Sequence, residues 1–315
     1  MRDIFLNRKV MEDRRNESLM RSSAGGENRA RTVLISTTIV VVLVVSSVGF
    51  FVYDSSPSPP SPYLVSTLVG NVTDPHPYYN TTNGYVSPNL WNLQKGEGNT
   101  TISVYSNSSI HVISNYTNVV TKTANIVGYP SVHFHYGLPA TVSGAIADNI
   151  SSSVSFNLIK TSQNLPVDVS YDIMIQPSST SFSPMVEIMI WMYYQPYYVN
   201  YFVLGHFISI SIVNGTQKNI TWIIEESKSA TNGAPLIRFT PDIPTYPAMS
   251  YSLNLSSFIS ETQSVLGLNL NNDYVQQINI GMEFGFSSFS HYSFSLWLFA
   301  TCNVNGVKVD ILGVV

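Results

Sequence analysis

Polar and apolar residues alternate along most of the chain after residue 100. Val154, Phe156 and Leu158 are separated by single polar residues, and the same spacing recurs at Ile278 and Ile280. Successive side chains of a β-strand point to opposite faces of its sheet, so a period of two indicates strands that are buried on one face only. The pattern therefore predicts an all-β protein built mainly from antiparallel strands.

One segment departs from this alternation. Between Asn254 and Leu268 the apolar residues Leu255, Phe258 and Ile259 recur with the spacing of a helical face, and Gly267 is a typical helix stop. One helix among many short strands favours a β-jelly roll with two packed antiparallel sheets and a concave cleft.

A second exception lies near the N-terminus, where residues 32–53 contain no charged side chain. A helix of this length rises about 1.5 Å per residue and crosses a hydrocarbon layer of roughly 30 Å. Basic residues precede the segment and the first lysine after it is Lys95, so the positive-inside rule places the N-terminus in the cytoplasm. A cleaved secretory signal, which would release the protein, is the alternative.

These features divide the chain into four parts. We expect a basic cytoplasmic tail (residues 1–31), a single transmembrane helix acting as a signal anchor (32–53), a Ser/Pro linker (54–62) and an extracellular β-jelly-roll domain (63–315).

The composition excludes several classes of function. The tail holds eight of the fifteen Lys and Arg residues, so the remainder carries seven basic against fourteen acidic residues. Such an acidic surface does not suit nucleic acid. A single cysteine, Cys302, excludes an internal disulfide framework and a thiolate zinc site. We expect no metal and no other cofactor.

Asn-x-Ser/Thr sequons are frequent in the exported part, as in a glycosylated surface, although sequence rich in Asn, Ser and Thr also creates them by chance. They begin at Asn71, Asn80, Asn99, Asn107, Asn115, Asn149, Asn214, Asn219 and Asn254.

Glu187 is the first acid that a purely structural role explains poorly. It lies in a strongly apolar predicted strand, where an uncompensated carboxylate is costly to bury. Alternation places Glu187, Met189, Trp191 and Tyr193 on one face. We interpret that face as the floor of a cleft.

Two further strands place acids on polar faces. Glu283 shares a face with Asn279 and the small Gly281, which leaves room for a ligand, and Asp172 follows Asp168 on an alternating strand. A pair of carboxylates that face one cleft is the arrangement that glycoside hydrolysis requires. The alternative is that each acid is a hydrogen-bonded group on a solvated sheet face.

Short motifs in this order resemble glycoside hydrolase family 12, the jelly-roll endoglucanases. The run Glu187-Ile-Met-Ile-Trp191 resembles the nucleophile strand of that family, and Ile280-Gly-Met-Glu283 resembles its acid/base segment. Asn89-Leu-Trp91 and Val169-Ser-Tyr-Asp-Ile173 are similar to two further family elements. Phe284 stands where many members have proline. Residues 63–88 have no counterpart that the motifs identify.

The resemblance implies a role for each matching residue. Glu187 would be the nucleophile, Glu283 the general acid/base, and Asp172 would hold the nucleophile by a hydrogen bond. The residues expected to contact the sugar are Asn89, Trp91, Met189, Trp191, Asn279 and His135.

Two other side-chain groups have simpler interpretations. His133 and His135 share a strand face with the spacing of metal ligands, but no cysteine or acid cluster completes a site, so we expect them to line the cleft. Trp222 and Trp297 are expected in the core.

The sequence therefore predicts a membrane-anchored, archaeal-type family member. It would be a monomer that cleaves internal β-1,4 bonds of a cellulose-like polysaccharide, with xylan or mixed-linkage glucan as other substrates. The alternatives are a non-catalytic carbohydrate-binding or surface-layer sandwich and, less well matched, a pilin-like subunit.

Overall fold

The structure is a computed structural model that describes residues 61–123, 126–160, 165–181, 183–195, 201–228, 233–285 and 291–315. The predicted tail, the predicted span and nearly all of the predicted linker lie outside these residues. No helix in the described ranges has the length and apolar content that crossing a membrane requires. Residues 62–315 form one compact unit.

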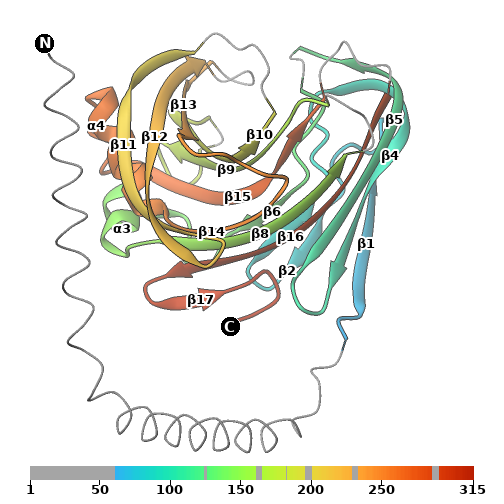
Figure 1. The fold of residues 1–315 in the computed structure, drawn as a ribbon, viewed down its shortest axis with the longest axis horizontal. Coiled ribbons are helices and arrows are strands. Elements are labelled where there is room, and N and C mark those ends of the chain that lie inside the picture. The colour runs from blue at the N-terminus through green and yellow to red at the C-terminus, as the bar shows by residue number, and fades with distance from the viewer. Residues whose placement is uncertain are drawn as a thin grey trace, which may run out of the picture. The chain divides into compact units, whose positions relative to one another are not determined.

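The described part of the chain is mostly strand, as the alternation predicts (Figure 1). The strands are β1 (Leu64–Gly70), β2 (Tyr79–Thr81), β3 (Gly84–Ser87), β4 (Leu93–Tyr105), β5 (Ile110–Thr121), β6 (Ser131–Phe134), β7 (Ala140–Thr141), β8 (Ser151–Lys160), β9 (Val167–Gln176), β10 (Val186–Tyr194), β11 (Phe202–Val213), β12 (Thr216–Lys228), β13 (Pro235–Pro241), β14 (Ala248–Asn254), β15 (Tyr274–Phe284), β16 (His291–Val304) and β17 (Val307–Val309).

Hydrogen bonding joins these strands into one ladder that folds back on itself. Its order is β1, β4, β5, β16, β8, β14, β11, β12, β13, β10, β9, β15, β6, β3 and β2, with β7 beside β15 and β17 beside β16. The all-β, jelly-roll-like prediction is confirmed. The prediction of two separate, purely antiparallel sheets is corrected in two respects. Strands β11 and β12 connect the two halves of the ladder, and β10 pairs with β13 in parallel.

The apolar core lies between the two halves of this ladder. Ile102 of β4 and Leu296 of β16 belong to the same buried cluster as Ile173 of β9 and Ile188 of β10. Every second side chain of β9 points into the core and is fully buried. The side chains between them, which include the polar residues of the strand, point to the opposite face of the sheet.

Two helices accompany the strands in the part of the chain that the structure describes. The predicted helix is confirmed as α4 (Leu255–Leu266), which begins at the N-cap Asn254 and ends at Gly267, whose positive φ of 61° suits glycine. A second helix, α3 (Val142–Ala147), was missed because six residues are too short for a helical period to show.

The alternation of β10 fails near its end. A β-bulge lies between Trp191 and Tyr193, and the side chain of Tyr193 joins the main core instead of the face of Glu187. The prediction for Tyr193 is therefore wrong, whereas Met189 and Trp191 form a separate small cluster with Leu236.

Candidate active site

Three adjacent strands carry the predicted acids, with β9 between β10 and β15 (Figure 1). Asp172 of β9 lies opposite Met189 on one side and Asn279 on the other. Glu187 lies opposite Met174, and Glu283 lies opposite Asp168. The two glutamates therefore approach the face from opposite ends of β9, with Asp172 between them.

The charges of these carboxyl groups act on one another. Burial raises the pKa of Asp172 well above its ordinary value, and the charge of Glu187 raises it further, while a hydrogen bond with Asn279 lowers it. Burial also raises the pKa of Glu283 well above its ordinary value, with the charges of Asp168 and Glu187 adding to the effect. The protons of such a group belong to the cluster rather than to single residues.

Asp168 also belongs to this cluster, although its sequence position predicted no role for it. It is fully buried, and its Oδ1 accepts a hydrogen bond from the Ser170 hydroxyl at 2.6 Å. Burial raises the pKa of Asp168 to about 7. Alternation already placed Asp168 on the face of Asp172, but only the register of β15 shows that it lies opposite Glu283.

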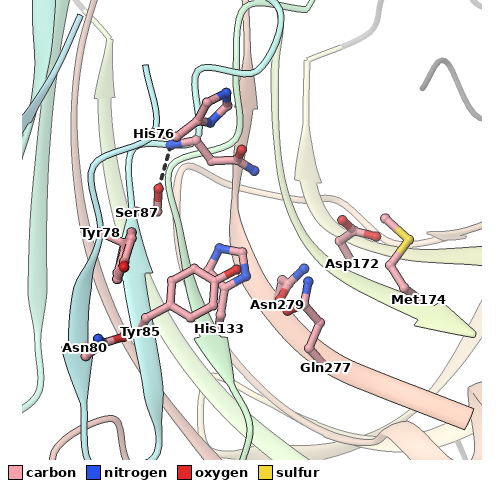
Figure 2. A pocket seen from close by; sticks show the side chains of 11 residues that line it. His76, Tyr78, Asn80, Tyr85, Ser87, His133, Asp172, Met174, Gln277 and Asn279 are labelled. Carbon is pink, nitrogen blue, oxygen red and sulfur yellow. Dashed lines mark hydrogen bonds between the residues drawn. The ribbon is translucent and has the colours of Figure 1, made fainter. Parts of the chain in front are cut away.

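Beside this cluster lies a cavity of about 670 Å³ (Figure 2). Figure 2 shows Tyr85 and His133 on one side of it and Asp172 with Met174 on the other. The ring of Tyr85 is stacked on that of His133, with centroids 4.0 Å apart and an interplanar angle of 14°. The lining residues are His76, Tyr78, Asn80, Tyr85, Ser87, Asn89, His133, Asp172, Met174, Gln277 and Asn279.

This cavity combines a flat aromatic wall with amide and acid groups, which suits a sugar ring and its hydroxyls. Of the predicted sugar contacts, Asn89 and Asn279 line it. The aromatic residues from the segment before β4 were missed, because no motif in residues 63–88 identifies them.

His133 lines the cavity, and His135 lies beside Gln277, which also lines it. Burial lowers the pKa of His133 to about 3, so its ring is neutral, and one ring nitrogen is 2.9 Å from the Ser131 hydroxyl. His135 is exposed, and its Nε2 lies 3.3 Å from Oε1 of Gln277 at the edge of the cavity. Within the described ranges, no group of three or more His, Cys, Asp or Glu side chains is placed to hold a metal ion.

Neither Met189 nor Trp191 is among the described residues that line the cavity, and Trp191 lies against a cation. The guanidinium of Arg238 is 4.1 Å from the ring centroid of Trp191 and 3.4 Å from that of Tyr201. Glu225 accepts two hydrogen bonds from the same guanidinium, at 2.9 and 2.5 Å. Arg238 therefore occupies one surface of the indole that was predicted to contact sugar.

The remaining predicted contact is Trp91. It is half-buried, its backbone carbonyl accepts a hydrogen bond from Nζ of Lys122 at 3.1 Å, and it is not among the described residues that line the cavity. The sugar-binding roles of Trp91, Met189, Trp191 and His135 stay predictions, as do the catalytic roles of the acids.

Residues 83–300, more than two thirds of the chain, match the sequence model of Glycosyl hydrolase family 12. The chain belongs to this family. The resemblance inferred from the short motifs is thereby confirmed at the level of the family, and the protein is a glycoside hydrolase. Membership in family 12 also sets aside the non-catalytic and pilin-like alternatives.

Solved structures of family 12 enzymes share the fold. A xyloglucanase from Bacillus licheniformis in complex with ligand has a TM-score of 0.58 and 19% identity, covering 74% of this chain and 97% of its own. Endoglucanase 3 from Trichoderma harzianum has a TM-score of 0.56 and 20% identity, covering 78% and 100%. The catalytic domain of Cel12A from Humicola grisea, with a thio cellotetraose, has a TM-score of 0.55 and 16% identity, covering 75% and 99%. Among curated protein sequences, none matches the chain.

Proposed function

We propose that the protein is a retaining endo-β-1,4-glucanase in which Glu187 is the nucleophile and Glu283 the general acid/base. One observation carries this proposal. Two glutamates on strands either side of β9 present interacting charges to each other and to Asp172, on the face that continues into the aromatic cavity. Family membership and the endoglucanase and xyloglucanase neighbours support it.

In the first step Glu187 attacks the anomeric carbon while Glu283 gives its proton to the leaving glycosidic oxygen. The glycosidic C–O bond breaks, and an ester bond between the sugar and Glu187 forms. The raised pKa of Glu283 supports this role, because a general acid must keep its proton until the bond breaks.

In the second step Glu283 takes a proton from a water molecule, which attacks the anomeric carbon and breaks the ester. Glu283 regains its proton and Glu187 its charge, and two displacements retain the configuration. This mechanism requires carboxyl groups about 5 to 5.5 Å apart. Asp172 would hold the nucleophile in place from the strand between them.

The preferred substrate in this proposal is a β-1,4-glucan of the cellulose type, with xylan, mixed-linkage glucan and xyloglucan as the close competitors. The cavity supports an unbranched chain that stacks on Tyr85 and meets the amides of Gln277 and Asn279. We also propose that residues 32–53 anchor the enzyme in the cell membrane with its catalytic domain outside, as a monomer. The uncharged run and its flanking charges support this.

The test uses the full-length chain and its Glu187→Gln variant on carboxymethyl-cellulose, xylan, lichenan and xyloglucan. The parent protein should lower the viscosity of a glucan faster than it releases reducing ends, and NMR should show the product with retained configuration. Glu187→Gln should lose at least about 10³-fold in kcat, since the covalent step has no nucleophile.

Glu261→Gln is the matched control, because Glu261 lies on α4, away from β9, β10 and β15. It should keep the parent activity. Hydrolysis of none of the four polysaccharides, or an inverted product, would refute the proposed mechanism. Full activity in Glu187→Gln would refute the assignment of the nucleophile.

A further inference from the structure

Asp168 and Glu283 are two acids of the site that pair directly across neighbouring strands. They lie directly opposite each other on the antiparallel strands β9 and β15, and residues in such positions have Cβ atoms about 4.5–5.5 Å apart. Asp168 shares its face with Asp172, while its neighbours Val167 and Val169 are buried in the core. The two carboxyl groups therefore interact on the face of the active site.

The hydrogen bonding of Asp168 leaves a position for one more donor. Its Oδ1 accepts the hydroxyl proton of Ser170. Its Oδ2 is buried and has no donor among the other described residues, while the side chain and backbone N–H of Glu283 both act on the Asp168 carboxyl. A buried carboxylate oxygen without a donor is costly, and a protonated Glu283 is the donor that the register places opposite it.

Other charged and titratable groups face this pair from every neighbouring element. Tyr129 comes from the segment before β6 and donates its hydroxyl proton to the carbonyl of Ser170 at 2.7 Å. Tyr201 and Arg238 lie on the side of β11 and β13. Among the residues that the structure describes, the groups that act on this pair or on Tyr201 beside it are Tyr129, Asp172, Glu187, Tyr201, Glu225 and Arg238. Arg238 is the only cation among these described groups, and it is already paired with Glu225.

We propose that Asp168 is a positioning residue that shares a proton with Glu283 and so keeps the acid/base protonated to a higher pH than Glu283 alone would allow. The inference rests on the proposed role of Glu283 as acid/base. Asp168 does not touch the reacting atoms in this scheme and acts only through its partner.

The direction of the effect follows from the order in which the pair loses its protons. Burial raises the pKa of both groups, and in this proposal Asp168 is the first of the two to ionise. Its negative charge then opposes the ionisation of Glu283. Removal of the second proton, and with it the loss of the general acid, moves to higher pH.

The proton balance of the cycle remains intact. Glu283 gives its proton to the leaving glycosidic oxygen, and a charged Asp168 then makes Glu283 a stronger base. The proton returns from the water molecule that cleaves the glycosyl ester, and the pair is restored.

The first test compares the full-length enzyme with Asp168→Asn, which keeps the size of the side chain and the acceptor for Ser170. The alkaline limb of kcat/KM against pH should move to lower pH by about one unit or more, because the charge next to Glu283 is gone. KM at the acidic plateau should change little. Asp242→Asn, at an exposed position after β13, is the control and should leave the profile unchanged. An unmoved or higher alkaline limb in Asp168→Asn overturns the inference.

A second measurement needs no activity. Glutamate labelled with ¹³C at the carboxyl carbon allows the titration of Glu283 to be followed by NMR, with Glu283→Gln to assign its signal. In the parent chain the signal should titrate above neutral pH with two inflections, one of them from Asp168. A single inflection in the ordinary glutamate range overturns the inference, even if Asp168→Asn does not fold.

The two measurements separate this inference from the proposed function. A chain that cleaves no glucan but shows the coupled titration would refute the function and keep the proton-sharing pair. A chain that cleaves glucan with retention but shows an uncoupled titration of Glu283 would keep the proposed function and refute the proton-sharing pair.

Discussion

Arg238 of β13 links β10, which carries Glu187, to the neighbouring strand β12, and its replacement tests how much this contact stabilises the fold. Its guanidinium lies between the rings of Trp191 and Tyr201 and forms an ion pair with Glu225 at 2.5 Å. The side chains of the ion pair are only 10% and 17% exposed. Methionine at position 238 would keep much of the packing volume but remove the charge and all five donors.

These contacts set the free energy of unfolding that the replacement removes. Removal of one partner from a buried ion pair destabilises a protein by about 3–5 kcal/mol, because the other charge stays buried without compensation. Glu225 is partly exposed and the Thr240 hydroxyl also donates to its Oε2 at 3.1 Å, which lowers this figure. The two stacked rings contribute about 0.5–1 kcal/mol each. We expect Arg238→Met to lose about 3 kcal/mol, a fall in Tm of roughly 6–12 °C.

A double-mutant cycle separates the ion pair from the stacking. Thermal and urea unfolding of the full-length chain would be followed for Arg238→Met, Glu225→Gln and the double variant. Since a neutral amide at position 225 needs no cation, the double variant should be more stable than Arg238→Met by about 1–3 kcal/mol. A loss below about 1 kcal/mol in Arg238→Met, or a double variant that is simply the sum of the singles, would refute the reasoning.

Two further predictions concern pH and substrate binding. The free energy of unfolding should rise as the pH falls from about 7 to 4. Carboxyl groups such as Asp168, with a pKa of about 7 in the fold, bind protons in this range that the unfolded chain, with its ordinary pKa, does not bind. His133 has the opposite effect below about pH 6.5, because its pKa in the fold is lowered to about 3 and only the unfolded chain binds its proton there. Urea unfolding at three pH values checks it, and a smaller rise is expected in Asp168→Asn. Tyr85→Ala should raise KM for a soluble glucan about tenfold with kcat nearly unchanged, since one aromatic wall of the cavity is lost. Tyr246→Ala, at an exposed position outside the cavity, is its control, and an equal rise in both variants would contradict the prediction.

Local patterns of the sequence predicted the parts of the fold that depend on local geometry. The period of two on β9 gave the correct buried face, and Asn254 and Gly267 correctly marked the ends of α4. The motif around Glu187 led to the correct family because it combines a rare acid with an otherwise apolar strand.

Features that depend on strand pairing could not be predicted in this way. Tyr85 reaches the cavity because β3 pairs with β6, and Arg238 reaches Trp191 because β13 pairs with β10 in parallel. Neither pairing leaves a trace in the local alternation. The same limit explains Trp297, which was expected in the core but is 38% exposed and stacked on His111 at 4.1 Å between centroids.

The central place of β9 between β10 and β15 has a consequence for biosynthesis. Its partner β10 begins ten positions after β9 ends, whereas β15 begins 98 positions after that end and leaves the ribosome much later. Until then one edge of β9 has no strand beside it, and its row of apolar side chains lacks part of its cover. We expect a nascent chain that stops before β15 to be prone to association through this edge, so the last strands to be translated would protect the protein as well as complete its catalytic face.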